Sequence, residues 1–399
     1  MGCISSYFVP ATRSDTLTPV TWMSDSSDSD DCDDGLADVQ RAVACWRRAA
    51  ASAFFAATLS LSTPQDGRGP QGSKKERTPF DWEVHVQKLS EKDFRARYRL
   101  NYEAFYDLCD LLYADLEYPS EFARKQARNT NMGVEFPVEA RVAVALRLLA
   151  GASYLDLMLI YNVSQGHAYD CLWQVIDAVN RHMPLAFPLD DPAKLAVLEK
   201  EFAAHTGGGV WRGQVGAIDG VHFAMLRPSN KVCKNAAKYY VSRKGMYATL
   251  CIAICDARRR FLHFDITKTA TTHDCLAFVT SQLGVKLEAG ALPPQYFIAG
   301  DSAFVASQYM VTPTNGEDTN FDFVQSSNRM AIECSFGILV RRWGIFWRPL
   351  ACSFNRRGQL IGACMRLHNF CINHNQEGAE EFVVTTHSGR QVAFMPGDR

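Results

Sequence analysis

Two aspartates and one glutamate stand where the chain could bring carboxylates to a common point. Asp219 ends the apolar run 215–218, and Asp301 closely follows the apolar run 296–299. Both runs have the length of buried strands, and ligands bind outside the carboxyl ends of parallel strands in open α/β sheets. Glu333 lies in a segment whose apolar residues recur at helical spacing. We expect this helix to pack on the sheet, so that the three carboxylates converge as catalytic residues.

Three carboxylates in one place restrict the chemistry that they can perform. They cannot all stay ionised without a compensating cation. Hard oxygen ligands suit Mg²⁺ or Mn²⁺, and such ions activate water and stabilise the leaving oxygen in phosphodiester cleavage. The alternative is that each aspartate only caps a turn or a helix, which is the common role of a single aspartate after a strand. The coincidence of three weighs against that alternative.

Two stretches without acidic residues adjoin these carboxylates. No Asp or Glu occurs between Asp219 and Asp256, or between Glu333 and Glu377. The first stretch contains the basic residues Arg227, Lys231, Lys234, Lys238, Arg243 and Lys244, with Tyr239, Tyr240 and Tyr247 among them. The second contains Arg341, Arg342, Arg348, Arg356, Arg357 and Arg366. Protein surfaces normally mix charge signs, so we predict that the first set, together with Arg341 and Arg342, binds DNA phosphates. Two unrelated basic loops are the alternative.

The pattern around these residues predicts an α/β core. Strand-like runs are expected at 215–219, 246–255, 261–266 and 296–299, and helices at 273–283 and 328–347. The order is three strands, a helix, a strand and then helices. It favours a mixed sheet flanked by helices, in which the first three strands are consecutive neighbours and the later strand returns through a crossover.

The preceding segment, residues 80–205, has a helical pattern. Helices are expected at 138–149 and 154–160, followed by a short break and a second helix at 164–180 with Ser164 as its N-cap. A short helix, a tight turn and a longer helix form the shape of a helix-turn-helix, although a plain helical hairpin has the same spacing. The second helix offers few side chains that read bases: Gln165, His167, Tyr169 and Gln174.

Composition sets the broad class. The chain has 399 residues, a formal net charge of -1 and 13 cysteines without a Cys-x-x-Cys pair, which indicates reduced thiols rather than secretion. Residues 1–79 are expected to be a disordered leader with an acidic run at 24–34. The apolar stretch 49–61 is too short for a membrane span. Gly2 and Cys3 fit a lipidation pattern that would favour a membrane-tethered protein, a match that six residues reach easily by chance.

Six short motifs, in order, resemble those of the PIF/Harbinger transposases and their domesticated relatives, a family of DDE superfamily endonucleases. They are Ala217-Ile218-Asp219-Gly220-Val221-His222, Tyr240-Val241-Ser242-Arg243-Lys244-Gly245, Thr272-His273-Asp274, Gly300-Asp301-Ser302-Ala303-Phe304, Ile332-Glu333-Cys334-Ser335-Phe336-Gly337 and Leu367-His368-Asn369-Phe370. The resemblance covers about residues 94–373. One departure is Ala270-Thr271-Thr272, where the family usually has Gly-Ser before the His-Asp turn.

The resemblance implies an RNase H-like catalytic core and divalent-metal ligands at Asp219, Asp274, Asp301 and Glu333. Without it, Asp274 would be read as the N-cap of the following helix. The resemblance also implies a helix-turn-helix in the helical region and a nuclear location. Its expected partners are double-stranded DNA, a separate Myb-like DNA-binding protein and further copies of the chain, with no membrane.

The carboxylates and basic stretches predict a metal-dependent nuclease, and the resemblance implies a DNA endonuclease that cleaves at transposon ends and transfers strands. The alternative of a different class is a domesticated DNA-binding protein without turnover, which the intact set of acids disfavours. The expected organisation is a leader at 1–79, a helical region at 80–205, a DDE nuclease domain at 213–375 and a tail at 376–399.

Overall fold

The computed structural model describes residues 79–130, 135–205, 211–314, 316–374, 382–385 and 391–394. The predicted leader up to residue 78, with its lipidation pattern at Gly2 and Cys3, lies outside these residues. Within the described ranges, no helix is both long and apolar enough to cross a membrane. The cysteines in these ranges are free thiols, as predicted, and several of them, including Cys251 and Cys364, lie in the core.

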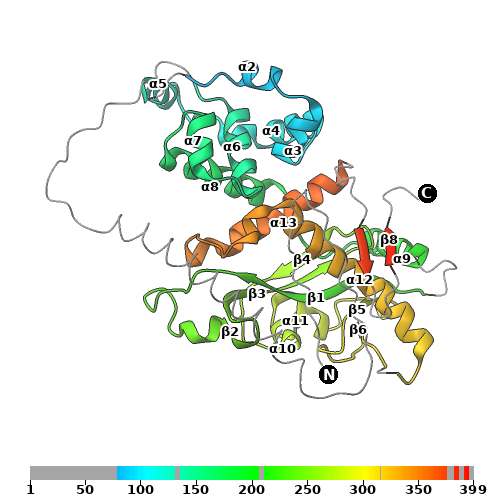
Figure 1. Ribbon diagram of the computed structural model, residues 1–399. Helices are drawn as coiled ribbons and strands as arrows, with labels where there is room; N and C mark the ends of the chain where they lie inside the picture. The colour runs from blue at the N-terminus through cyan, green and yellow to red at the C-terminus, as the bar shows by residue number, and fades with distance from the viewer. Residues whose placement is uncertain are drawn as a thin grey trace, which may run out of the picture. The chain divides into compact units, whose positions relative to one another are not determined.

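A region of helices comes first in the described chain (Figure 1). It consists of α2 (Trp82–Gln87), α3 (Glu91–Tyr98), α4 (Tyr102–Leu116), α5 (Glu121–Thr130), α6 (Val138–Leu149), α7 (Tyr154–Ile160), α8 (Gln165–His182) and α9 (Pro192–His205). Helix α6 has the predicted bounds and is buried on almost every face, as expected for an apolar central helix. Gly151 ends it at φ +95°, and an added Cβ would lie 3.0 Å from the backbone of Gly344, so glycine also permits a close approach to the core.

The short helix, turn and longer helix predicted at 154–180 are present as α7 and α8. Asn162 in the turn has a φ of +52°, in the left-handed region that asparagine tolerates. Ser164 caps α8, as predicted, because its Oγ accepts a hydrogen bond from the His167 amide at 3.2 Å. This geometry fits a helix-turn-helix and a helical hairpin equally.

The second half of the chain folds around a mixed sheet. Its strands are β1 (Gln214–Ala224), β2 (Tyr240–Val241), β3 (Met246–Cys255), β4 (Phe261–Asp265), β5 (Phe297–Ala299) and β6 (Met310–Val311). Strand β3 is antiparallel to both β1 and β4, whereas β5 is parallel to β1 and to β6. The predicted arrangement is confirmed: β1, β3 and β4 are consecutive neighbours, and β5 returns beside β1 through a crossover.

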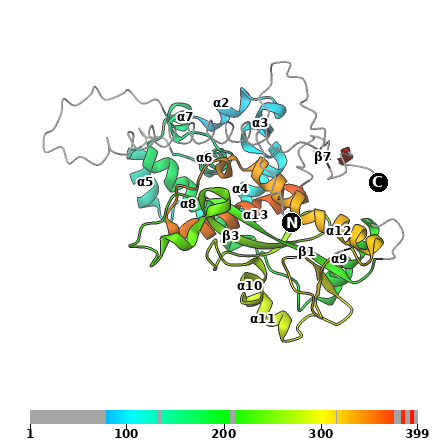
Figure 2. The same cartoon turned by 60° about the horizontal axis from the view of Figure 1, so that its bottom comes forward.

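Helices cover both faces of this sheet (Figure 1, Figure 2). They are α10 (Asp274–Val279), α11 (Gln282–Glu288), α12 (Thr319–Arg342) and α13 (Arg357–Asn373). Ala217 and Phe223 of β1 join the core that contains α12, α13 and the helical region. Ile218 joins a second core with α9, α10 and α11. Successive residues of β1 therefore point to opposite helical layers.

Two predicted helices have different bounds in the structure. The single helix expected at 273–283 is two helices, since Ser281 interrupts it and caps α11 through the Gly284 amide at 3.0 Å. The helix expected at 328–347 begins earlier, at Thr319, where Asp318 is the N-cap, and ends at Arg342. Trp343 leaves the helix because its indole is fully buried and donates to the Cys364 carbonyl at 3.1 Å.

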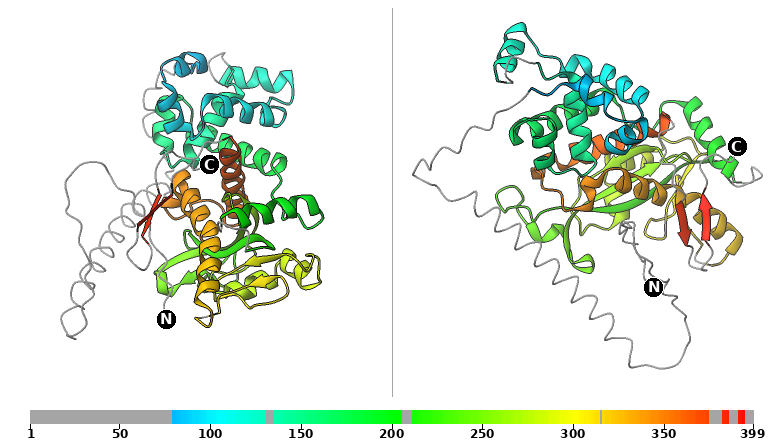
Figure 3. Two further views of the ribbon diagram at one scale, coloured as in Figure 1. Left: turned by 90° about the vertical axis from the view of Figure 1, so that its right-hand side faces the viewer. Right: turned by 45° about the horizontal axis from the view of Figure 1, so that its top comes forward.

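Near the end of the chain, β7 (Phe382–Thr385) and β8 (Gln391–Phe394) pair with each other as a separate antiparallel ribbon (Figure 3). These strands fall within the segment predicted as a tail.

Candidate active site

Strand register places Asp219 and Asp301 side by side. In the parallel pair of β1 and β5, Ala217 is opposite Ala299, and each aspartate follows two residues later. The prediction of neighbouring parallel strands is therefore confirmed. The prediction that Asp219 ends its strand is wrong, because β1 continues to Ala224 by pairing with β3, with Asp219 opposite Ala253.

Local hydrogen bonds orient the two aspartates. Asp219 Oδ1 accepts from the Gly220 amide at 2.7 Å, and Asp301 Oδ1 accepts from the Ala303 amide at 3.0 Å. Both are turn-type bonds, so the structural role weighed as the alternative is present as well. In each case these bonds leave the second carboxylate oxygen available for another partner.

Helix α12 brings Glu333 to the same point. Gln325 of this helix is fully buried, and its side-chain amide donates to the Gly300 carbonyl at 2.6 Å, directly before Asp301. Two turns later, Glu333 Oε1 accepts from the Arg329 guanidinium at 2.6 Å. Arg329 also interacts electrostatically with Asp219 and Asp301. The structure therefore gathers three carboxylates around one arginine.

The pKa of Asp219 reflects the negative charges that lie close to it. Burial raises the pKa of Asp219 to about 7, and the charges of Asp301 and Glu333 act in the same direction. The Gly220 amide and Arg329 lower it only in part. Without a further cation, this carboxyl is close to half protonated at neutral pH.

Asp274 approaches from the opposite face of β1. It lies at the start of α10, below Gly220, where an added Cβ would come within 2.5 Å of Asp274 Oδ2. Burial raises the pKa of Asp274, with Asp301 acting in the same direction and His222 against it. Asp301 thus interacts with both Asp219 and Asp274, whereas Asp219 and Asp274 flank β1 from its two faces.

The carboxylates fit a hard divalent cation by their chemistry. Among the residues that the structure describes, no three His, Cys, Asp or Glu side chains are yet arranged to hold a metal ion. The donor set is nevertheless all oxygen, and it carries more negative charge than Arg329 balances. Asp219, Asp301 and Glu333 would hold the ion, with Asp274 adjacent. Glu333 would first have to leave Arg329.

Replacing Arg329 with Gln is therefore expected to strengthen divalent-cation binding. The variant removes the internal cation that competes for Glu333 and should lower the Kd for Mn²⁺ by about tenfold, as titration calorimetry can measure. Arg341→Gln removes an equal charge from the exposed end of the same helix and should leave the Kd within about twofold, as surface charges do. Equal or weaker Mn²⁺ binding by the Arg329 variant would contradict this assignment.

The two acid-free stretches lie side by side. Met225 forms a β-bridge with Leu350, the Leu226 amide donates to the Leu350 carbonyl at 3.1 Å, and the Leu350 amide donates to the Ala224 carbonyl at 2.8 Å. The first stretch exposes five of the predicted DNA-binding residues: Arg227, Lys231, Lys234, Lys238 and Arg243. Lys244 is partly buried, which lowers its pKa. The two stretches are therefore connected at Leu350.

Most arginines of the second stretch have structural roles. Arg342 is only 8% exposed and donates to the His368 carbonyl at 3.3 Å, so it does not face solvent and we remove it from the predicted DNA-binding set. Arg356 pairs with Asp177 of α8, and Arg366 donates to the Met183 carbonyl at 2.6 Å. These two contacts connect the helical region to the core. Arg341, in contrast, is exposed.

Two residues of the site were not predicted from the sequence in these roles. Arg329 stands four residues before Glu333, a spacing that by itself indicates an ion pair on a helix. His222 belongs to the first motif, and its Nε2 is 2.9 Å from the Ala270 carbonyl, which connects β1 to the segment before Asp274. That long-range contact left no signal in the sequence.

Comparison with known proteins adds an independent observation. Residues 218–369, which include all four carboxylates, match the DDE superfamily endonuclease family. A protein of Homo sapiens named "Putative nuclease HARBI1" is 25% identical over 282 residues, covering 68% of this chain and 75% of the relative. "Protein ALP1-like" of Arabidopsis thaliana is 24% identical over 329 residues, covering 76% of each chain. No solved structure matches.

Proposed function

Residues 218–369 form a DDE superfamily endonuclease domain, and from this premise we propose that the protein is a divalent-metal-dependent nuclease acting on double-stranded DNA. The observation that carries the proposal is the register of β1 and β5, which sets Asp219 beside Asp301 and within electrostatic reach of Glu333. The exposed basic residues of the stretch 220–255 support DNA as the substrate.

The chain's own residues perform most of the proposed work by binding and positioning. Mg²⁺ or Mn²⁺ would supply water activation and charge neutralisation at the leaving oxygen. Asp219, Asp301 and Glu333 would hold the cation, and the hydrogen bond from Gln325 to the Gly300 carbonyl keeps α12 aligned with β5. Arg243 and Lys244 follow β2 and bind the phosphates of the DNA backbone.

DNA cleavage by the Asp301→Asn variant tests the proposal. With Mg²⁺ or Mn²⁺, the full-length chain is expected to cleave DNA, and Asp301→Asn should reduce the rate by about 10³-fold or more, equivalent to several kcal/mol. Asp265→Asn is the matched control, because Asp265 ends β4 and accepts hydrogen bonds from Thr267. If wild type and Asp301→Asn cleave alike, or neither cleaves with either metal, the proposal is rejected.

Gly220→Ala is expected to weaken cleavage through Asp274. The added Cβ would displace the Asp274 carboxylate from its place below β1, and loss of such support typically costs about 10- to 100-fold in activity. Asp265→Asn again serves as the control, because Asp265 ends β4 and its carboxylate accepts hydrogen bonds from Thr267 rather than from groups around Gly220. Initial rates of DNA cleavage for both variants decide the point. Wild-type rates in Gly220→Ala would show that Asp274 has no role.

The proposal extends to transposon ends. We propose that the enzyme cleaves terminal inverted repeats and joins the freed strand to target DNA on an RNase H-like core, in the nucleus, with a Myb-like partner and in a homo-oligomer. Helices α7 and α8 are the proposed DNA-binding helix-turn-helix, and Gln165, Tyr169 and Gln174 are exposed on α8. His167 instead packs edge-on against Phe136. Selective cleavage of repeat-containing DNA over shuffled DNA tests this extension.

A further inference from the structure

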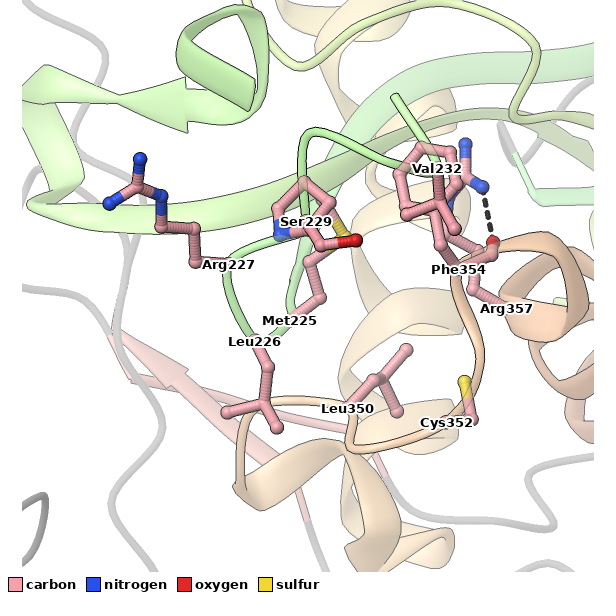
Figure 4. A pocket seen from close by; sticks show the side chains of 10 residues that line it. Met225, Leu226, Arg227, Ser229, Val232, Leu350, Cys352, Phe354 and Arg357 are labelled. Carbon is pink, nitrogen blue, oxygen red and sulfur yellow. Dashed lines mark hydrogen bonds between the residues drawn. The ribbon is translucent and has the colours of Figure 1, made fainter. Parts of the chain in front are cut away.

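We propose that a pocket at the far end of β1 receives one unstacked pyrimidine base of the bound DNA strand, an inference that rests on the proposed function. The pocket lies between the segments 225–232 and 350–357, which belong to the two acid-free stretches (Figure 4). The bridge between Met225 and Leu350 joins its two sides. Neither stretch contributes an acidic side chain, and the lining includes Arg227 and Arg357, so the pocket suits a neutral base that carries a phosphate.

The size of the pocket matches a single six-membered ring. Its volume is about 160 Å³. A protein cavity of about 150 Å³ with apolar walls accommodates benzene. A pyrimidine has one ring of this size, whereas a purine has two fused rings. We therefore expect a pyrimidine to fill the pocket and the second ring of a purine to extend beyond its walls.

The walls of the pocket suit a base with its phosphate. Val232 and Phe354 provide apolar and aromatic surface, and the Ser229 hydroxyl can bond to the edge of a base (Figure 4). The Arg357 guanidinium lies 3.8 Å from the centroid of the Phe354 ring and donates to Thr249 Oγ1 at 2.9 Å, so it is fixed in place. Arg227 is a second, exposed cation among the lining residues, and its guanidinium lies 6.0 Å from the centroid of the Tyr247 ring. Apolar stacking surface with cationic groups is how proteins hold extruded bases.

The position of the pocket relates it to the carboxylates. Met225 directly follows β1, six residues after Asp219, and a strand rises about 3.3 Å per residue, so the pocket lies about 20 Å from Asp219. Bases of a DNA strand are spaced about 3.4 Å apart. DNA that follows β1 would therefore place its sixth nucleotide from the cleaved bond at this pocket.

Binding to mismatched DNA tests the proposal separately from catalysis. The full-length chain with Asp301→Asn would be titrated at one salt concentration with duplexes that are matched or carry a central T·T or A·A mismatch. A mismatched base unstacks at low cost. We expect T·T DNA to bind about tenfold more tightly than matched DNA, and A·A DNA to bind within about twofold of it, because the second ring of a purine would extend beyond the walls of the pocket.

Filling the pocket should remove this preference. Val232→Trp and Leu226→Trp each add an indole from an exposed wall position, at 48% and 46% exposure. Both should bind T·T and matched DNA equally, with melting temperatures like that of the parent. Val197→Trp on α9, at 53% exposure, should retain the preference. Retention of the T·T preference by both pocket variants, or its absence in the parent, overturns the pocket assignment. Loss of cleavage in the wild-type chain would instead overturn the proposed nuclease function.

Discussion

Replacing Asp219 with Asn is expected to slow DNA cleavage by about 10³-fold or more and, at the same time, to stabilise the protein at neutral pH. The carboxylate is needed to hold the cation, and an amide cannot supply its charge. Stability changes in the opposite direction because burial and two neighbouring carboxylates already make the ionised Asp219 unfavourable. Asn can still accept the Gly220 amide hydrogen bond through Oδ1. Cleavage rates and melting temperatures of the same preparation measure both effects.

Asp256→Asn is the matched control for these two opposite effects on cleavage and on stability. Asp256 is fully buried, and burial raises its pKa, as for Asp219. Asp256, however, has its own cation, since Arg260 Nε donates to Oδ2 at 2.6 Å. Breaking this buried pair should cost about 3 kcal/mol while DNA cleavage continues. If Asp219→Asn instead lowered the melting temperature as Asp256→Asn does, Asp219 would stabilise the fold. It would then not be a carboxylate that destabilises the metal-free protein when ionised.

The neighbouring positions of Asp219 and Asp301 could be predicted from the sequence because the pattern of a buried strand is contained within one short segment. Two apolar runs, each followed closely by an aspartate and separated by further strands and a crossover helix, imply two parallel strands whose carboxyl ends lie at one edge. The continuation of β1 beyond Asp219 could not be predicted in this way. Residues 220–224 form a strand because they pair with β3, and such pairing between distant segments leaves little pattern in either segment alone.

The number of charged residues can be read from the sequence, but the place of each charged side chain in the fold cannot. The stretch 334–376 is rich in arginine without acids, which suggested a DNA surface. In the structure, Arg342 and Arg366 donate to main-chain carbonyls and Arg356 pairs with Asp177. Arginine can act as a packing residue because its guanidinium offers several donors and its stem is apolar. Whether an arginine is solvated or docked depends on partners from distant parts of the chain.

The stability of the metal-free protein is expected to fall as the pH rises toward neutrality. The carboxyl of Asp219 has an ordinary pKa of 3.8 in the unfolded chain and a pKa of about 7 in the folded chain. The folded state therefore holds a proton that the unfolded state has lost between these values, so the contribution of Asp219 to stability is present below about pH 4 and disappears as the pH passes 7. Between pH 5 and pH 8 the loss amounts to about 3 kcal/mol. Denaturant unfolding in EDTA measures it.

The same carboxylate connects this pH dependence to the cation. Asp219→Asn removes the titrating group, so the free energy of unfolding of the variant minus that of wild type should grow by about 3 kcal/mol from pH 5 to pH 8 in EDTA. A divalent ion binds only the deprotonated carboxylate, so Mn²⁺ at about 100 times its Kd should restore about 3 kcal/mol to wild type at pH 8 and little to the variant. A pH profile of wild type that parallels that of the variant would mean that Asp219 titrates normally. If Mn²⁺ stabilised wild type and Asp219→Asn equally, the ion would bind away from Asp219. The catalytic centre would then lie elsewhere as well.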